Sequence, residues 1–146
     1  MTDPSDMWTY CVVINDKQPG GGGPYTFREY VEVASVYFHP FGGGFGWPKS
    51  PPNFFAFRWS GKVQRIHRVI AHEVVESLQA RWPDIPVDAR TNRPHVVHDL
   101  GPALRFDPLP NGKQYRAGRH WLLLDQLFTS TTLAEALAGT ESLRVQ

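Results

Sequence analysis

Hydrophobic residues, four of them aromatic, fill the run from Phe54 to Trp59 apart from Arg58, so this segment is predicted to form a β-strand with two faces. One face carries Phe55, Phe57 and Trp59, and the other carries Phe54, Ala56 and Arg58. A Ser60-Gly61 turn follows, and a second predicted strand runs from Lys62 to Val75. We therefore expect a β-hairpin, in which the first strand pairs with the second as far as Val69.

Shorter patterns along the rest of the chain predict further strands and several short helices. Strands are expected over residues 7–14, 31–38 and 95–100, where apolar and β-branched residues cluster. A helical turn is expected from Thr26, because Thr26 and Glu29 fit a capping box, and further helices are expected over residues 76–82, 121–128 and 132–137. The predicted fold class is α+β, with a small curved antiparallel β-sheet or small β-barrel and short peripheral helices.

Size and charge limit the classes of partner. At 146 residues the chain is expected to form a single domain, residues 1–146, with a flexible Gly-rich segment over residues 17–24. A formal net charge of +1 means that any basic surface must come from local placement. The lone Cys11 lies in an apolar run and is expected to be buried. Without a signal peptide or an apolar run of about 18 residues, the protein is expected to be cytoplasmic, with no membrane partner.

A loop rich in glycine and proline, residues 39–52, precedes the predicted hairpin. Its glycines allow the backbone to approach another group closely, and its prolines stiffen the exit. Phe41, Phe45 and Trp47 are large rings in a segment that is expected to be polar. They either fill the chain's own core or line a pocket for a flat ligand, and the sequence leaves both possibilities open.

Basic side chains follow the aromatic strand closely, at Lys62, Arg65, His67 and Arg68. Cationic groups contact phosphates and aromatic rings stack on bases, so this combination is typical of proteins that hold single-stranded or flipped bases. The alternative is a solvated sheet face that carries ordinary charges. The candidate ligand-binding residues are Phe45, Trp47, Trp59, Arg58, Arg65 and His67.

The six histidines fit no metal-ligand pattern. His95 and His98 are three residues apart and so belong to opposite faces of a strand. The segment that begins at His72 resembles the start of a zinc-protease motif, but Glu76 stands where its second histidine is needed. Phosphate-binding loops and nucleophile elbows are absent from the sequence as well. We therefore predict no metal, no cofactor and no catalytic residue.

A series of motifs gives the chain a recognisable order of parts. They are the Gly/Pro loop leading into Asn53-Phe54-Phe55-Ala56-Phe57-Arg58, the Gly61 turn, Asp99-Leu100-Gly101-Pro102, Trp121-Leu122-Leu123-Leu124 and Leu133-Ala134-Glu135-Ala136-Leu137. Over residues 37–137 this order resembles the PUA-like superfamily, which includes EVE, ASCH and YTH domains. The resemblance implies a small β-barrel that binds RNA or modified bases in an aromatic-lined pocket. The rings of that pocket do not align one by one, so Phe45, Trp47 and Trp59 are candidates by their chemistry.

Three functions follow from these observations. The first is a non-enzymatic nucleic-acid-binding module, for RNA or DNA, that recognises a modified or flipped base in an aromatic pocket. The second is a small enzyme acting on a nucleotide or nucleic acid, with an acid–base pair built from His67 or His98 and Asp99. The third is a protein-interaction module that docks through residues 41–47.

Overall fold

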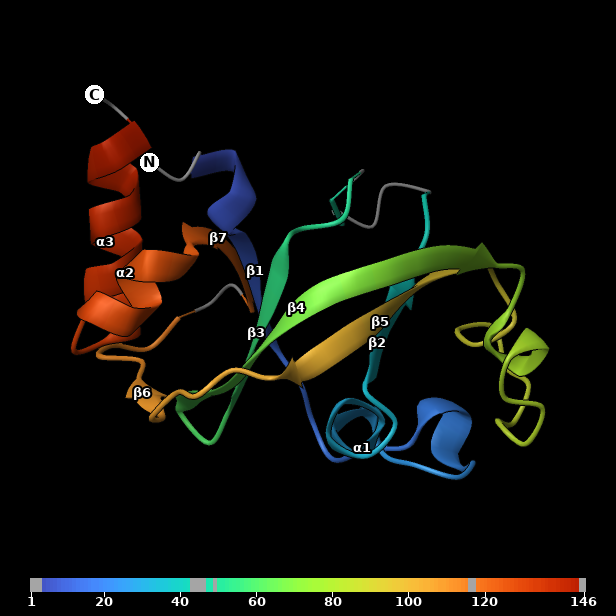
Figure 1. Ribbon diagram of the computed structural model, residues 1–146. Helices are drawn as coiled ribbons and strands as arrows, with labels where there is room; N and C mark the ends of the chain where they lie inside the picture. The colour runs from blue at the N-terminus through green and yellow to red at the C-terminus, as the bar shows by residue number, and fades with distance from the viewer. Residues whose placement is uncertain (1–3, 43–46, 49, 116–117, 145–146) are drawn as a thin grey trace. The chain divides into compact units, whose positions relative to one another are not determined.

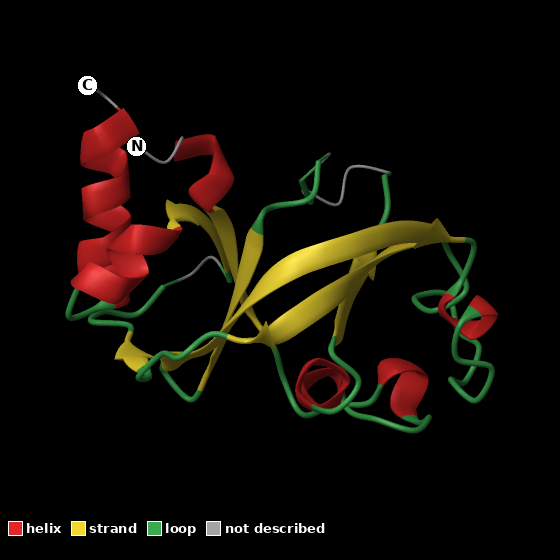
Figure 2. Cartoon of the chain, in the orientation of Figure 1, coloured by secondary structure: helices red, strands yellow, loops and turns green. Residues whose placement is uncertain are grey.

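The computed structural model describes residues 4–42, 47–48, 50–115 and 118–144. The chain divides into two compact units, neither of which is continuous in sequence. The first unit contains Met1–Ile14, Pro52–Arg68 and Pro102–Gln146, and the second contains Asn15–Pro51 and Val69–Gly101. The chain therefore passes between the units four times. The fold class is α+β, with mostly antiparallel strands and short helices (Figure 2).

The sheet of the first unit is built around the predicted hairpin. Strand β3 (Phe54–Trp59) pairs with β4 (Lys62–Val75) across the Ser60-Gly61 turn, which confirms that prediction. On its other side β3 pairs in parallel with β1 (Trp8–Val13), and β1 pairs antiparallel with β7 (Arg119–Leu123). The strand order here is β4-β3-β1-β7, and the short β6 (Leu109–Pro110) pairs with the start of β4.

A β-bulge corrects the face that the sequence pattern gives to Val63. Phe57 lies opposite Arg65, but the next residue, Arg58, lies opposite Val63, so Gln64 is an extra residue on β4. Strict alternation places Val63 on the same side as Arg65. Because of the bulge, Val63 instead shares the core face with Ile66, and both side chains are fully buried.

Helices α2 (Leu124–Thr129) and α3 (Leu133–Arg144) pack against each other and against β7 (Figure 1). The helix expected over residues 121–128 begins later than predicted, because Trp121 to Leu123 pair with β1 as strand. The backbone N–H of Leu123 donates a hydrogen bond to Oγ1 of Thr140, 3.1 Å away, which ties β7 to α3. The core of this unit consists of Cys11, Phe54, Ala56, Val63, Ile66, Leu109, Leu122, Leu127, Leu133 and Ala136.

The second unit combines α1 (Phe27–Glu32), β2 (Val36–Pro40), β5 (His95–Ala103) and the part of β4 after Arg68. Helix α1 starts with the predicted capping box, in which Thr26 Oγ1 accepts a hydrogen bond from the N–H of Glu29 at 3.1 Å. The strand order is β2-β5-β4, and β2 and β5 are antiparallel. A 3-10 helix over Leu78–Ala80 stands where the sequence predicts a helix over residues 76–82.

Candidate functional site

A cavity of about 760 Å³ in the first unit lies beside the turn between β3 and β4. It brings together Arg58 and Trp59, two of the sequence-predicted site residues, with the segment after β6. Its lining consists of Val13, Arg58, Trp59, Ser60, Gly61, Pro110, Asn111, Gly112, Lys113, Gln114, Tyr115 and Gly118. We call it the Arg58 cavity. Its described lining contains two cationic side chains and no carboxylate, so it is suited to an anion.

Arg58 occupies this cavity because β3 ends there with its core face turned toward the cavity wall. The side chain is only 4% exposed. Its guanidinium hydrogen-bonds the thiol of Cys11, and burial raises the pKa of that thiol to about 12, so Cys11 stays neutral. The guanidinium carbon also lies 5.5 Å from the centre of the Tyr115 ring. Arg58 is thus a positive charge held in a fixed position at the edge of the core.

A second cation shares the Tyr115 ring with Arg58. The ammonium of Lys113 lies 5.2 Å from the ring centre, and among the described residues Lys113 forms no ion pair. Two cations on one ring repel each other, and a bound anion relieves that repulsion. Sequence reasoning missed Lys113 and Tyr115, although Gly112, which has a φ of +84°, marks a turn at that point.

Arg65 and His67 lie on the opposite face of the same sheet from Arg58. They stand opposite Phe57 and Phe55, whose side chains alternate with those of the Arg58 face. The Arg65 Nε donates a hydrogen bond to Nε2 of His67 at 3.2 Å, so the proton of the neutral His67 ring is on Nδ1. His67 is 1% exposed. These two candidates therefore do not line the cavity that holds Arg58 and Trp59.

Trp47 belongs to the second unit, where its ring stacks on His39 with centroids 4.3 Å apart and planes 8° from parallel. Tyr37 lies beside both rings. One face of the Trp47 ring is thus covered by the protein itself. Phe45, the remaining aromatic candidate, lies outside the described residues, as does most of the loop over residues 41–47. Phe41, at its start, is 50% exposed.

The two potential acid–base residues of the second unit have other partners. The carboxylate of Asp99 accepts a hydrogen bond from Arg81 at 2.9 Å. His98 and His39 face each other through their Nε2 atoms, 2.9 Å apart. His39 Nδ1 lies 2.9 Å from the carbonyl of Pro40 and donates to it, so Nε2 of a neutral His39 accepts the proton of His98. Burial, with the nearby His39 and His72, lowers the pKa of His98 to about 3.

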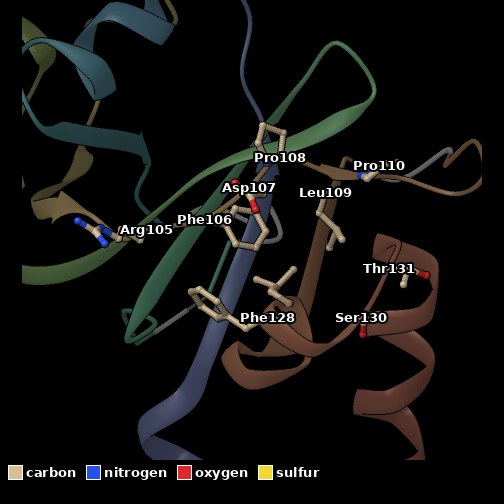
Figure 3. Close-up of a pocket in the computed structure, with 10 residues that line it drawn as sticks. Arg105, Phe106, Asp107, Pro108, Leu109, Pro110, Phe128, Ser130 and Thr131 are labelled. Carbon is tan, nitrogen blue, oxygen red and sulfur yellow. The ribbon is translucent and has the colours of Figure 1, made fainter.

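Another cavity of the first unit, of about 560 Å³, lies between residues 105–110 and the end of α2 (Figure 3). Phe106 and Phe128 meet there edge to face, with centroids 5.3 Å apart, and Arg105 points away from them. None of the sequence-predicted site residues lines this cavity. It therefore contributes nothing to the candidate site.

The described residues contain no metal-ligand cluster, no membrane-spanning helix and no disulfide. No group of three or more histidine, cysteine, aspartate or glutamate side chains is arranged to hold a metal ion. Every helix in the described part of the chain is too short or too polar to span a bilayer. A disulfide within the chain is impossible, because the sequence has one cysteine, the buried Cys11.

Comparison with known proteins assigns this chain to no family. No protein-family model, no curated protein and no solved structure matches this chain.

Proposed function

We propose that this protein binds nucleic acid and holds a backbone phosphate in the Arg58 cavity. The observation that carries the proposal is the pairing of a buried arginine with Lys113 in a cavity whose described lining has no carboxylate. Trp59 lines the same cavity and offers an aromatic surface for a base. The order of motifs that resembles the PUA-like superfamily supports the same function.

We propose further that the protein holds a modified or flipped base against its aromatic rings. Trp47 supports it, because its stack on His39 supplies a flat ring held in place by the protein. Such a platform suits a base removed from its own stack. In this proposal the protein binds nucleic acid and catalyses no reaction.

Fluorescence anisotropy with labelled single-stranded RNA and DNA tests the proposal across a salt series. Lys113→Gln should weaken binding at every salt concentration and reduce the salt slope by about one, because one phosphate contact is lost. Trp59→Leu and Trp47→Ala should each weaken binding by about 1–3 kcal/mol and leave the slope unchanged, because stacking does not release counterions.

Arg105→Gln is the matched control, since Arg105 is exposed and lines a different cavity. It should bind like the wild type. If no single- or double-stranded oligonucleotide, modified or unmodified, binds the folded wild type, the proposal is wrong. If Lys113→Gln changes nothing while binding persists, the phosphate site lies elsewhere.

A further inference from the structure

The second unit contains a cavity of about 810 Å³ that the proposed function does not use. Its volume is in the range of small-molecule sites. It is lined by Asn15, Asp16, Lys17, Gln18, Pro19, Gly20, Gly21, Thr26, Phe27, Phe38, His39, Pro40, Leu78, Asp88, Arg90, Thr91, Arg93 and His95. We call it the His95 cavity. All of these residues belong to the second unit.

Backbone hydrogen bonds fix the walls of the His95 cavity. The N–H of Phe27 donates to the carbonyl of Lys17 at 2.9 Å, which joins the first loop to α1. The N–H of Leu78 donates to the carbonyl of Thr91 at 3.0 Å, which joins the 3-10 helix to the loop before β5. A cavity whose walls are linked in this way is formed before a ligand arrives.

One residue of the lining, His95, offers a buried hydrogen-bond acceptor beside apolar groups. His95 is 4% exposed, and its Nδ1 lies 2.7 Å from the carbonyl of Arg93, to which it donates. The other ring nitrogen, Nε2, has no hydrogen-bond partner among the described residues and presents a lone pair. The ring lies edge-on to Phe38, which packs against Phe27. Burial lowers the pKa of His95, which keeps the ring neutral.

The lining of the cavity carries more cations than carboxylates: Lys17, Arg90 and Arg93 against Asp16 and Asp88. Asp16 lies 3.6 Å from Arg28, which is not part of the lining. Asp88 accepts hydrogen bonds from the backbone N–H groups of Arg90 and Thr91, at 2.8 and 2.9 Å. Its carboxylate therefore stabilises the turn over residues 88–91. Among the described residues, neither Lys17 nor Arg90 forms a close ion pair, although the backbone hydrogen bonds of Asp88 and the charge of Arg90 lower the pKa of Asp88. The rim therefore attracts an anion.

We propose that the His95 cavity binds a small phosphorylated heterocycle, with an N–H group on the edge of the heterocycle donating to Nε2 of His95 and its phosphate held by Lys17 and Arg90. Phe27, Phe38 and Leu78 in the lining favour a flat ring over a free sugar, because a ring buries its apolar faces against them while its edge donates a hydrogen bond. This site is independent of the Arg58 cavity, so neither proposal depends on the other.

Isothermal titration calorimetry with AMP and UMP tests the proposal, with adenosine, ribose 5-phosphate and inorganic phosphate as partial ligands. At least one nucleotide should bind about tenfold more tightly than any partial ligand, because only the nucleotide reaches both ends of the cavity. Absence of nucleotide binding at millimolar concentration overturns the proposal. Equal binding of inorganic phosphate also overturns it, because the heterocycle then contributes nothing.

Arg90→Gln tests the rim, since this side chain is exposed and its loss leaves the loop hydrogen bonds in place. It should weaken nucleotide binding about tenfold and leave adenosine binding unchanged. Arg105→Gln should change neither. An Arg90→Gln protein that binds the nucleotide like the wild type contradicts the proposal.

His95 is tested in the wild-type protein as well, because a variant of a buried residue can fail to fold. The ¹⁵N resonance of His95 Nε2 should shift on nucleotide binding, as expected when a lone pair accepts a hydrogen bond, and should not shift with inorganic phosphate. An unshifted resonance in a saturated complex overturns the assignment.

The independence of the two cavities is tested by exchanging the variants. Lys113→Gln should leave nucleotide binding intact, and Arg90→Gln should leave oligonucleotide binding intact. Loss of both activities in either variant contradicts two independent sites.

Discussion

Aromatic rings make up a larger share of the hydrophobic cluster of the second unit than of the cluster around Cys11 and Leu122 in the first unit. In the first, strands and helices bring branched side chains such as Ile66, Leu122 and Leu133 together. In the second, Tyr30 contacts Phe38 and Trp82 with ring centroids 5.2 and 5.0 Å apart. The second unit has short helices and long loops, and large rings fill the wide gaps that such elements leave.

The difference matters for the two cavities. The Arg58 cavity lies at the edge of the cluster around Cys11 and Leu122, and its rings, Trp59 and Tyr115, come from a turn and a loop. The His95 cavity takes a ring, Phe38, directly from the core of its unit. Changes in the second core should therefore affect its cavity, while changes in the first core should act mainly on stability.

Core truncation should produce the largest effects and separate the two units. Phe38→Ala should lower the free energy of unfolding by about 3–5 kcal/mol and Leu122→Ala by about 2–5 kcal/mol, because both side chains are buried. Hydrogen exchange should rise first in the second unit for Phe38→Ala and first in the first unit for Leu122→Ala. A uniform rise for both variants contradicts separate cores.

Acid should destabilise the second unit before the first. The pKa of His98 is lowered to about 3, so between about pH 6.5 and pH 3 the unfolded chain binds a proton that the folded chain does not. Stability from this group is therefore lost as the pH falls through that window, by at most about 1.4 kcal/mol per pH unit. Denaturation at several pH values measures the slope, and His98→Asn should flatten it. An unchanged slope in a folded variant assigns the acid sensitivity to another group.

Two neighbouring glycines of the second unit should differ in how well they tolerate a side chain. Gly20 and Gly21 both have positive φ, but a Cβ on Gly20 lies 2.5 Å from the carbonyl oxygen of Pro86, whereas one on Gly21 meets nothing within 4 Å. Gly21→Ala should cost about 1 kcal/mol of stability from backbone strain, and Gly20→Ala should cost more. Thermal unfolding of the pair measures the difference, and equal losses would show that Pro86 moves aside.

Tyr30→Phe should have the smallest effect. Its hydroxyl is buried and has no hydrogen-bond partner among the described residues, and burial raises its pKa to about 12. Removing an unsatisfied hydroxyl while the ring stays in place should leave the free energy of unfolding within about 1 kcal/mol or raise it. A loss of about 2 kcal/mol or more in chemical denaturation points to a partner for the hydroxyl.

Local signals explain which parts of the fold follow from the sequence. The strand patterns on either side of Ser60-Gly61 predict the hairpin, and the capping box at Thr26 predicts the start of α1. The parallel pairing of β1 with β3 aligns Thr9 with Phe54, and no local pattern announces a contact over that distance along the chain. The extra residue at Gln64 has no sequence mark either, so alternation assigns Val63 to the wrong face.

The candidate site also combines residues that are close in sequence with residues that only the fold brings together. Arg58 and Trp59 are consecutive residues, so their proximity can be expected from the sequence. Lys113 and Tyr115 join them only through the fold, and the separation of Arg65 and His67 depends on which face each side chain takes. Residue chemistry can be predicted from the sequence, but the grouping of distant residues cannot.

The four passages of the chain between the units determine the order in which each is completed during synthesis. The first unit begins with Met1–Ile14 and cannot add β7, α2 or α3 until residues after Pro102 have emerged from the ribosome. Every residue of the second unit, up to Gly101, has been made by then. Translation therefore presents a complete second unit while β1 still has an unpaired edge where β7 will add. A nascent chain stalled after Gly101 would expose that edge to other chains, and this interval carries the greatest risk of misassembly.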